Sequence, residues 1–438
     1  MLAISFGTVP STLVTPHIAV EFFAPHDVYL NTSKCATIEG VAANPVCVKA
    51  QNDFETVQSV GAGVSGLLQL WVAPTLGKLS DAHGRRPLLV AAAVLPTLTA
   101  ASLLLVQSTG MSLWVYFAVS FVSRFSPINT VFLAFVADVT TLDERLSAFP
   151  LIIGGFSLAE ILANAIYTAI AASVAPATLL LIGVIAIGTG IIYVYTTIPE
   201  THPVEERKAF ELNASQLDPR SALKMFLQPE LRMLAATLSL FFVSRTALAV
   251  TSNGYSVFRF NLQPQEIGTL TIAGAVASFI VVIAVLPVAL RYFHEFRLIF
   301  MALLVAAGAC VFLSFAPTFG LYVAGTCASE AFAMTGPVIL VNMSKRVPKS
   351  DQGALDGGQV ALSSIIISIT TVLIGSVIFR ISRLLGFFIA AGGLSLTAFL
   401  ALRIPAHQPE AVDSADGTSA SAGLDSASVY TQLQDDAL

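Results

Sequence analysis

Charged side chains are scarce in this chain: only 11% of its 438 residues are Asp, Glu, Lys or Arg. Soluble domains usually carry about 25%. Hydrophobic residues make up 55% of the chain, and the mean hydropathy is +0.80. These values fall outside the range of soluble proteins, so we expect an integral membrane protein. Its partner is then the lipid bilayer, and we expect no binding to nucleic acid.

Several motifs of catalysis and energy coupling are also missing. No G-x-x-x-x-G-K-[ST] phosphate-binding loop occurs, which argues against ATP-driven transport on this chain. The six histidines never cluster at metal-ligand spacing, and no H-E-x-x-H motif is present. We therefore expect no cofactor, no metal site and no enzymatic activity.

Apolar runs long enough to cross a bilayer are abundant. A spanning helix needs about 20 mostly apolar residues, whereas a barrel strand needs about 10 in alternation. Every span must therefore be a helix. Twelve spans are predicted, at residues 1–23, 56–76, 87–106, 112–137, 146–172, 175–198, 231–252, 266–290, 298–315, 319–342, 357–379 and 384–403.

The distribution of Lys and Arg predicts which loops face the cytoplasm. If the loop after the second span is cytoplasmic, alternate loops and the tail collect fifteen of the 22 basic residues, and the opposite face collects five. The positive-inside rule then places both termini in the cytoplasm. We expect the membrane to be the plasma membrane or an endolysosomal membrane. No cleavable signal peptide is evident. The first run begins at Met1 without a polar flank, so either this helix barely spans the membrane or its first turns are missing from the sequence, and we expect the second.

The long predicted outer loop, residues 24–55, contains Cys35 and Cys47 and the glycosylation sequon at Asn31. A Cys35–Cys47 disulfide and a sugar at Asn31 would suit an extracellular or lumenal loop. The alternative is that the thiols stay free and the sequon is unused.

The sequence divides into two similar parts. Residues 1–198 form a predicted six-helix bundle, residues 199–230 a polar cytoplasmic linker, and residues 231–403 a second six-helix bundle. The tail, 404–438, is poor in large apolar residues, which predicts disorder. Within it, Tyr430-Thr431-Gln432-Leu433 has the Y-x-x-Φ form of a sorting signal, a pattern that also arises by chance.

Two segments resemble motifs of a known family. The stretch from Gly77 to Arg86 reads G-x-L-x-D-x-x-G-R-R, which resembles the loop between helices 2 and 3 of the major facilitator superfamily. The A-D-V-T-x-x-x-E-R segment ending at Arg145 is similar to the helix 4 to 5 junction of the tetracycline/H⁺ antiporters and, more closely, of the hippocampus-abundant-transcript-like branch. The proton-coupled folate transporter branch shares the G-R-R-P turn, the A-D-V junction and a cysteine-bearing outer loop.

The resemblance implies a fold and a moving part. The fold would be an all-α membrane protein of twelve helices in two pseudo-symmetric six-helix bundles, which rock about a site at mid-membrane lined by helices 1, 4, 7 and 10. It also implies a cytoplasmic gate in which Arg85 pairs with Asp138 and Asp81 lies at the start of helix 11. The gate residues would be Gly77, Asp81, Gly84, Arg85, Arg86, Asp138, Glu144 and Arg145. This chain lacks the acid in early helix 1 that related antiporters carry, so their mechanism does not transfer directly.

Four charges lie deep inside predicted spans: Arg124, Glu160, Arg245 and Glu330. A lone charge at such a depth costs on the order of 3 kcal/mol or more, so these side chains should not face lipid. We expect the two arginines to bind an anionic or polar substrate group and Glu160 or Glu330 to take a proton, with Asn164 on the face of Glu160. The alternative is two structural ion pairs, Arg124 with Glu160 and Arg245 with Glu330.

These features predict a secondary active transporter of a small organic solute, coupled to protons and acting as a monomer. The alternative from a different class is a transport-inactive receptor or trafficking adaptor with the same fold, which would use the tail and the linker to bind partners. The substrate cannot be read from the sequence, because neither charge nor aromatic content separates a drug, a folate-like anion and a sugar.

Overall fold

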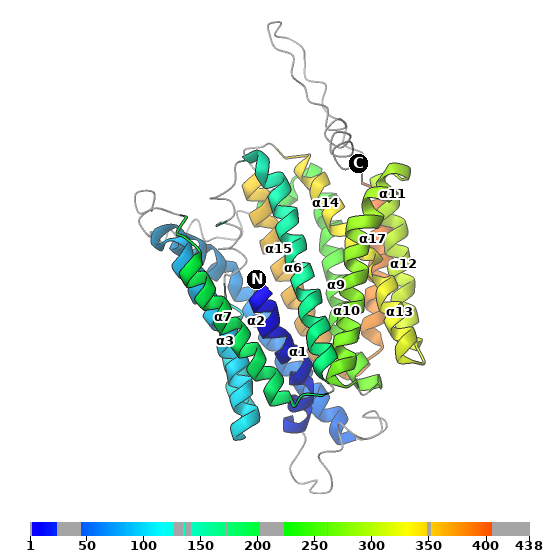
Figure 1. Cartoon of the computed structure of the whole chain (residues 1–438). Coiled ribbons are helices and arrows are strands. Elements are labelled where there is room, and N and C mark those ends of the chain that lie inside the picture. The colour runs from blue at the N-terminus through cyan, green and yellow to red at the C-terminus, as the bar shows by residue number, and fades with distance from the viewer. Residues whose placement is uncertain are drawn as a thin grey trace, which may run out of the picture. The chain divides into compact units, whose positions relative to one another are not determined.

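All regular structure in the described part of the chain is helical (Figure 1). The computed structural model describes residues 2–23, 45–126, 135, 142–171, 173–201, 223–260, 262–347 and 352–404. Residues 2–201 are called the N half below, and residues 223–404 the C half. The helices of the N half are α1 (Leu2–Phe23), α2 (Pro45–His83), α3 (Arg85–Thr109), α4 (Leu113–Ser123), α6 (Leu142–Ala171) and α7 (Pro176–Thr197).

The C half begins with a 3₁₀ turn, Met225–Leu227, and continues with longer helices, several of them interrupted. They are α9 (Pro229–Phe260), α10 (Pro264–Ile280), α11 (Leu286–Tyr292), α12 (Glu295–Phe315), α13 (Phe319–Ser329), α14 (Thr335–Ser344), α15 (Gln352–Val372), α16 (Phe379–Ile381) and α17 (Leu385–Ala401). Seven helical segments of the described residues are long and apolar enough to cross a membrane, and each lies on or close to a predicted span. The segment on the eleventh predicted span is Gly358–Ile381.

The second helix is much longer than its sequence predicts. The expected span was 56–76, with loop residues before it and a turn from Gly77, but α2 runs from Pro45 to His83 without a break. Within the extension, Gln51 donates a 3.0 Å hydrogen bond to Glu55 one turn later. At 1.5 Å per residue the 39 residues cover about 58 Å, so α2 projects beyond a 30 Å hydrocarbon core. Residues 45–55 of the predicted outer loop and 77–83 of the predicted turn are therefore helical.

Two spans that the sequence predicts as continuous helices change their winding before a proline. A π-helical turn, Val281–Val285, separates α10 from α11 just before Pro287, and a 3₁₀ turn, Glu330–Met334, separates α13 from α14 just before Pro337. Proline has no N–H to give to the carbonyl four residues earlier, so the backbone rewinds locally. Glu330 thus lies at the first residue of a helix break.

Each half has its own apolar core. The core of the N half consists of buried side chains from the sequence range Val9 to Leu180. The larger core of the C half consists of buried side chains from the range Phe226 to Ile404. Of the best spanning window in α12, 56% is buried within the protein, against 6% in the α10–α11 segment. The apolar surface of α10–α11 is therefore the surface that the fold offers to lipid.

The two halves meet through α2 with α15 and through α6 with α10. The side of the helices on which Gly84 lies is called the Gly84 end, and the opposite side, on which Arg380 lies, is called the Arg380 end. The sequence predicts that the Gly84 end faces the cytoplasm.

Close packing at Gly386 of α17 gives a test of the C-half core. A Cβ there would lie 1.8 Å from Oγ1 of the buried Thr251 on α9, whereas a Cβ at Gly392, also on α17, would meet nothing within 4 Å. We expect Gly386→Ala to destabilise the protein by about 1–3 kcal/mol, measured as a lower unfolding temperature in detergent. Gly392→Ala is the control and should leave that temperature unchanged or slightly raised; equal effects of the two variants would contradict the packing.

Candidate functional site

Of the deep charges, Arg245 and Glu330 lie closest to one another. Arg245 of α9 places its guanidinium 5.8 Å from the ring centre of Phe332, in the 3₁₀ turn that Glu330 begins. Both Arg245 and Ser278 of α10 act on the Glu330 carboxyl. Arg245 and Glu330 form no direct salt bridge in the structure, so the arginine keeps its hydrogen-bond donors for another partner. An arginine, a carboxyl and a serine from three helices can together bind a polar group.

Arg124 lies in the N half, at the end of α4. Its backbone carbonyl accepts a hydrogen bond from Gln69 of α2. Together with Gln58, Tyr116 and Ser120 it lines a small pocket of about 100 Å³ between α2 and α4, completed by Val57, Gly61, Phe117 and Phe121. This space is sufficient for a few water molecules or a small polar group.

Glu160 and Asn164 do not join Arg124 in the structure. The Glu160 residue is exposed, and the buried Asn164 side chain donates a 2.9 Å hydrogen bond to the Glu160 carbonyl of its own helix α6. No direct salt bridge links Glu160 to Arg124 among the described residues. Arg245 and Glu330 therefore form one group in the C half, and Arg124 lies apart from them in the N half.

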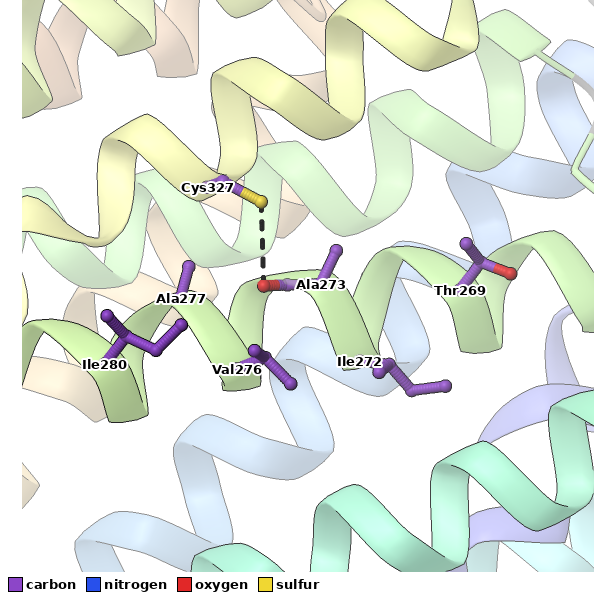
Figure 2. Close-up of a pocket in the computed structure, with 7 residues that line it drawn as sticks. All are labelled: Thr269, Ile272, Ala273, Val276, Ala277, Ile280 and Cys327. Atoms are coloured by element: carbon purple, nitrogen blue, oxygen red, sulfur yellow. Dashed lines mark hydrogen bonds between the residues drawn. The ribbon is translucent and has the colours of Figure 1, made fainter.

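A further concavity of the described structure lies along α10 (Figure 2). It measures about 530 Å³ and is lined by Thr269, Ile272, Ala273, Val276, Ala277, Ile280 and Cys327. Its lining is nearly all apolar, and the Cys327 thiol is turned to the carbonyl of Ala273, 3.6 Å away. The α10–α11 segment is the least buried of the candidate spans, and the concavity lies along α10 on this surface. It is close to the Glu330 group, since a Cβ at Gly274 would lie 3.8 Å from Oε1 of Glu330.

At the Gly84 end, glycine and arginines build a rigid turn inside the N half. Gly84 has φ +102°, a conformation that favours glycine, and it ends α2 directly before α3. The buried Arg85 donates to the Ser80 hydroxyl at 2.8 Å. The backbone N–H groups of Arg85 and Arg86 donate to the Glu200 carboxylate at 2.8 and 3.2 Å.

The remaining gate predictions stay open. The Arg86 guanidinium donates to the Tyr195 carbonyl and lies 5.0 Å from the Tyr195 ring centre. Gly77 and Asp81 lie in α2, and Glu144 and Arg145 in α6, but the described part of the structure does not include their side chains. Asp138 lies outside the described residues, so its pairing with Arg85 stays a prediction.

At the Arg380 end, hydrogen bonds join the two halves directly. Arg380 of α16 donates to Asp53 at 2.8 Å and to Thr56 at 3.1 Å, and Arg383 donates to Asn52 at 3.3 Å. These five residues are called the Arg380 latch. Between residues whose side chains the structure describes, these three hydrogen bonds connect the N half to the C half.

Aromatic rings and a glycine support the latch. The Arg383 guanidinium lies 3.3 Å from the ring centre of Phe258 on α9 and 5.7 Å from that of Phe379. Burial among these groups lowers the pKa of Arg383 to about 10, which leaves it charged at neutral pH. Nearby, a Cβ at Gly375 would lie 1.8 Å from the Ser59 hydroxyl of α2, so the halves are in close contact there.

The predicted features of the loop before α2 are only partly described. Cys47 lies in α2, is buried and is disulfide-bonded, whereas Cys310 and Cys327 are free. Its expected partner Cys35 and the sequon at Asn31 lie outside the described residues, so the pairing and the glycosylation stay predictions.

A sequence model of the Major Facilitator Superfamily matches residues 40–357. The chain belongs to this superfamily. Its fold is accordingly the major facilitator fold, with twelve membrane helices in two pseudo-symmetric six-helix bundles.

Curated relatives in this superfamily are of two kinds. Human hippocampus abundant transcript-like protein 1 is 30% identical over 166 residues, which cover 37% of this chain and 32% of that protein. The chain thus spans about a third of the length of the first relatives it matches. The class C tetracycline resistance protein of Escherichia coli is 26% identical over 325 residues, 72% of this chain and 78% of that protein.

Solved structures show the same fold. The human organic anion transporter MFSD10 (TETRAN) superposes with a TM-score of 0.62 at 18% identity, covering 91% of this chain and 97% of that one. The E. coli xylose transporter XylE, in an inward-open conformation, gives a TM-score of 0.63 at 14% identity, covering 94% and 95%.

Sequence reasoning about this major facilitator chain missed Glu200 and the Arg380 latch. A carboxylate directly after the sixth predicted span, next to the Gly84 turn, was a usable signal, because a helix N-terminus attracts a carboxylate. Asp53, Arg380 and Arg383 were also visible as charges at the ends of the second and eleventh spans. Their pairing depends on contacts between distant segments, which spacing along the chain does not give.

The role of Glu200 can be tested by removing its carboxylate. We expect Glu200→Ala to destabilise the start of α3 by about 1–3 kcal/mol, because two backbone donors lose their acceptor. The measurement is hydrogen exchange at residues 85–90. Glu230→Ala, at the exposed first turn of α9, is the control; if both variants leave exchange in α3 unchanged, the cap is not needed.

Proposed function

We propose that this chain is a secondary active transporter that moves a small organic solute across a membrane by alternating access, coupled to protons. One observation supports this most: at the Arg380 end, Arg380 and Arg383 of the C half donate side-chain hydrogen bonds to Asp53, Thr56 and Asn52 of the N half. At the Gly84 end, Glu200 and Arg85 hold the turn between α2 and α3. Two rigid bundles joined at one end are the arrangement that rocking requires.

The proposed membrane orientation relates this arrangement to a state of the cycle. If the Gly84 end is cytoplasmic, as the Lys and Arg distribution predicts, the latched Arg380 end faces the outside or the lumen. The chain is then closed to the outside. The bundle boundaries belong to this proposal: residues 1–198 and 231–403 would move against one another, with 199–230 as the linker.

The substrate site that we propose lies between Arg124 of the N half and Arg245 of the C half. Two arginines suit an anionic or polar group on the solute. The printed names of related proteins, a tetracycline resistance protein and an organic anion transporter, support a small organic solute. An arginine beside a carboxyl favours its charged form, so movement of Arg245 relative to Glu330 would bind or release a proton.

The substrate class is tested first by binding. A panel of organic anions, sugars, nucleosides and tetracyclines is added to the purified full chain, and unfolding temperatures are compared. A ligand at 100 times its dissociation constant should stabilise the protein by about 2.7 kcal/mol. Hits are then followed as uptake into proteoliposomes at two pH values. Binding without uptake at either pH would favour a receptor over a transporter.

Glu330 is the residue on which proton coupling depends in this proposal. We expect Glu330→Gln to abolish proton-driven uptake or uncouple it from pH while the protein still reaches the membrane, because the amide cannot exchange a proton. Glu266→Gln is the matched control, since Glu266 only closes the capping box with Gln263 at the start of α10. Wild-type uptake by Glu330→Gln at all pH values would rule out the coupling role.

A further inference from the structure

A carboxyl group that the proposed transport site does not use lies in the contact between the halves at the Arg380 end. A Cβ on Gly254 of α9 would lie 3.0 Å from Oε1 of Glu55 and 2.9 Å from Cζ of Phe379. The Glu55 carboxyl of α2 thus lies against two elements of the C half. Part of the residue can still be reached by solvent, but protein surrounds the carboxyl itself.

The hydrogen bonding of Glu55 offers little to an ionised carboxylate. Its one hydrogen-bond donor among described residues is Gln51 Nε2, 3.0 Å from Oε1. An ionised carboxylate in such a place usually needs a cation or several donors. Gln51 is itself buried, so it cannot bring water to the carboxylate.

The charged groups around Glu55 do not compensate for the missing partner. Arg380 and Arg383 from α16 and the following turn are bonded to Asp53, Thr56 and Asn52. Arg259, near the end of α9, lies over the Phe260 ring.

The other elements near Glu55 add no described cation. On α1, which also packs against α2, the charged residues are His17 and Glu21, whose side chains lie outside the described residues. The helix α4 carries no charged residue between Leu113 and Ser123, and Arg124 directly after it lines the pocket with Val57 and Gln58 but does not act on the Glu55 carboxyl. The neutral form of Glu55 is therefore the form that fits the closed contact.

We propose that Glu55 is a proton-binding site and that a proton on its carboxyl is required for the Arg380 end to close. This inference rests on the proposed alternating access and adds to it a second protonation site, on the opposite side from the Gly84 turn. When the halves part at this end, water reaches the carboxyl and the proton leaves to solvent. When a proton binds, the carboxyl becomes neutral and can enter the contact.

The direction of the pH dependence follows from burial. Glu55 precedes the predicted span 56–76, and burial in the closed contact raises its pKa from 4.5 to about 7. Because the raised pKa belongs to the closed state, closure is favoured at low pH and is lost as the pH rises through 7. With an ordinary pKa in the open state, the ratio of closed to open protein should fall about 30-fold between pH 5.5 and 8.5.

The test measures this ratio directly and needs no substrate. Spin labels are attached to Ser112→Cys and Gly320→Cys, exposed positions at the Arg380 end of the N half and C half, in a background with Cys310→Ala and Cys327→Ala. Pulsed EPR on the full chain in nanodiscs gives the short-distance and long-distance populations at pH 5.5 and 8.5. We expect the ratio to change about 30-fold in the parent protein and to be independent of pH in Glu55→Gln.

Two further variants separate Glu55 from its neighbours. Asp53→Asn removes the salt bridge to Arg380 and should lower the closed population equally at both pH values, keeping the pH response. Gln51→Met removes the donor that favours the ionised carboxylate, so the midpoint of the response should move to higher pH.

The outcomes distinguish this inference from the transport proposal. A full pH response in Glu55→Gln, or an unchanged midpoint in Gln51→Met if Glu55→Gln does not fold, would overturn the role of Glu55 while leaving alternating access intact. A single distance at every pH, with no second population, would overturn both.

Discussion

The cost of placing charge in a low-dielectric membrane constrains this protein more than any other interaction. An unpaired charge at the bilayer centre costs about 3 kcal/mol or more, so the deep charges of a chain with only 11% charged residues should not face lipid. The described structure places its charges at three levels: the Gly84 turn, the groups around Arg124 and Arg245, and the Arg380 latch. At each level the polar groups have different partners, and this difference gives the fold its asymmetry.

At the Gly84 end, the described bonds of Glu200 and Arg85 hold one turn of the N half. The Glu200 carboxylate holds the start of α3, and Arg85 is bonded to Ser80, so the turn moves as one piece with the N half. At the Arg380 end the bonds cross between the halves instead. The level around Arg124 and Arg245 differs from both ends. Arg245 acts on Glu330 without a direct salt bridge, so the hydrogen-bond donors of Arg245 are left for a ligand.

Much of the fold follows from the sequence, because long apolar runs leave the backbone no alternative to helix. The predicted positions of the spans agree with most of the described helices, and the motifs around Gly84 indicated the superfamily. The length of α2 was not predictable from hydropathy, since residues 45–55 are helical although polar. The break at Glu330 could have been read from Pro337, but its 3₁₀ form depends on local packing.

The candidate site was predictable only in its chemistry. The sequence singled out four deep charges and offered Arg245 with Glu330 and Arg124 with Glu160 as alternative pairs, but it could not decide which of these residues meet. Such pairing depends on the rotation of each helix about its own axis, and each helix is rotated by its packing with distant segments. The Arg380 latch was missed for the same reason, because its partners are more than 300 residues apart.

The strength of the latch explains why a proton at Glu55 would matter. The Arg380 and Asp53 side chains are 47% and 33% exposed, and a salt bridge of that kind contributes about 0–1 kcal/mol. Close packing at Gly375 and Gly254 also holds the halves in contact, but this packing does not change with pH. A 30-fold change in the closed population corresponds to about 2 kcal/mol, which exceeds the contribution of the salt bridge. The free-energy change that we propose for protonation of this one carboxyl would therefore be large enough to decide whether the two halves stay together at that end.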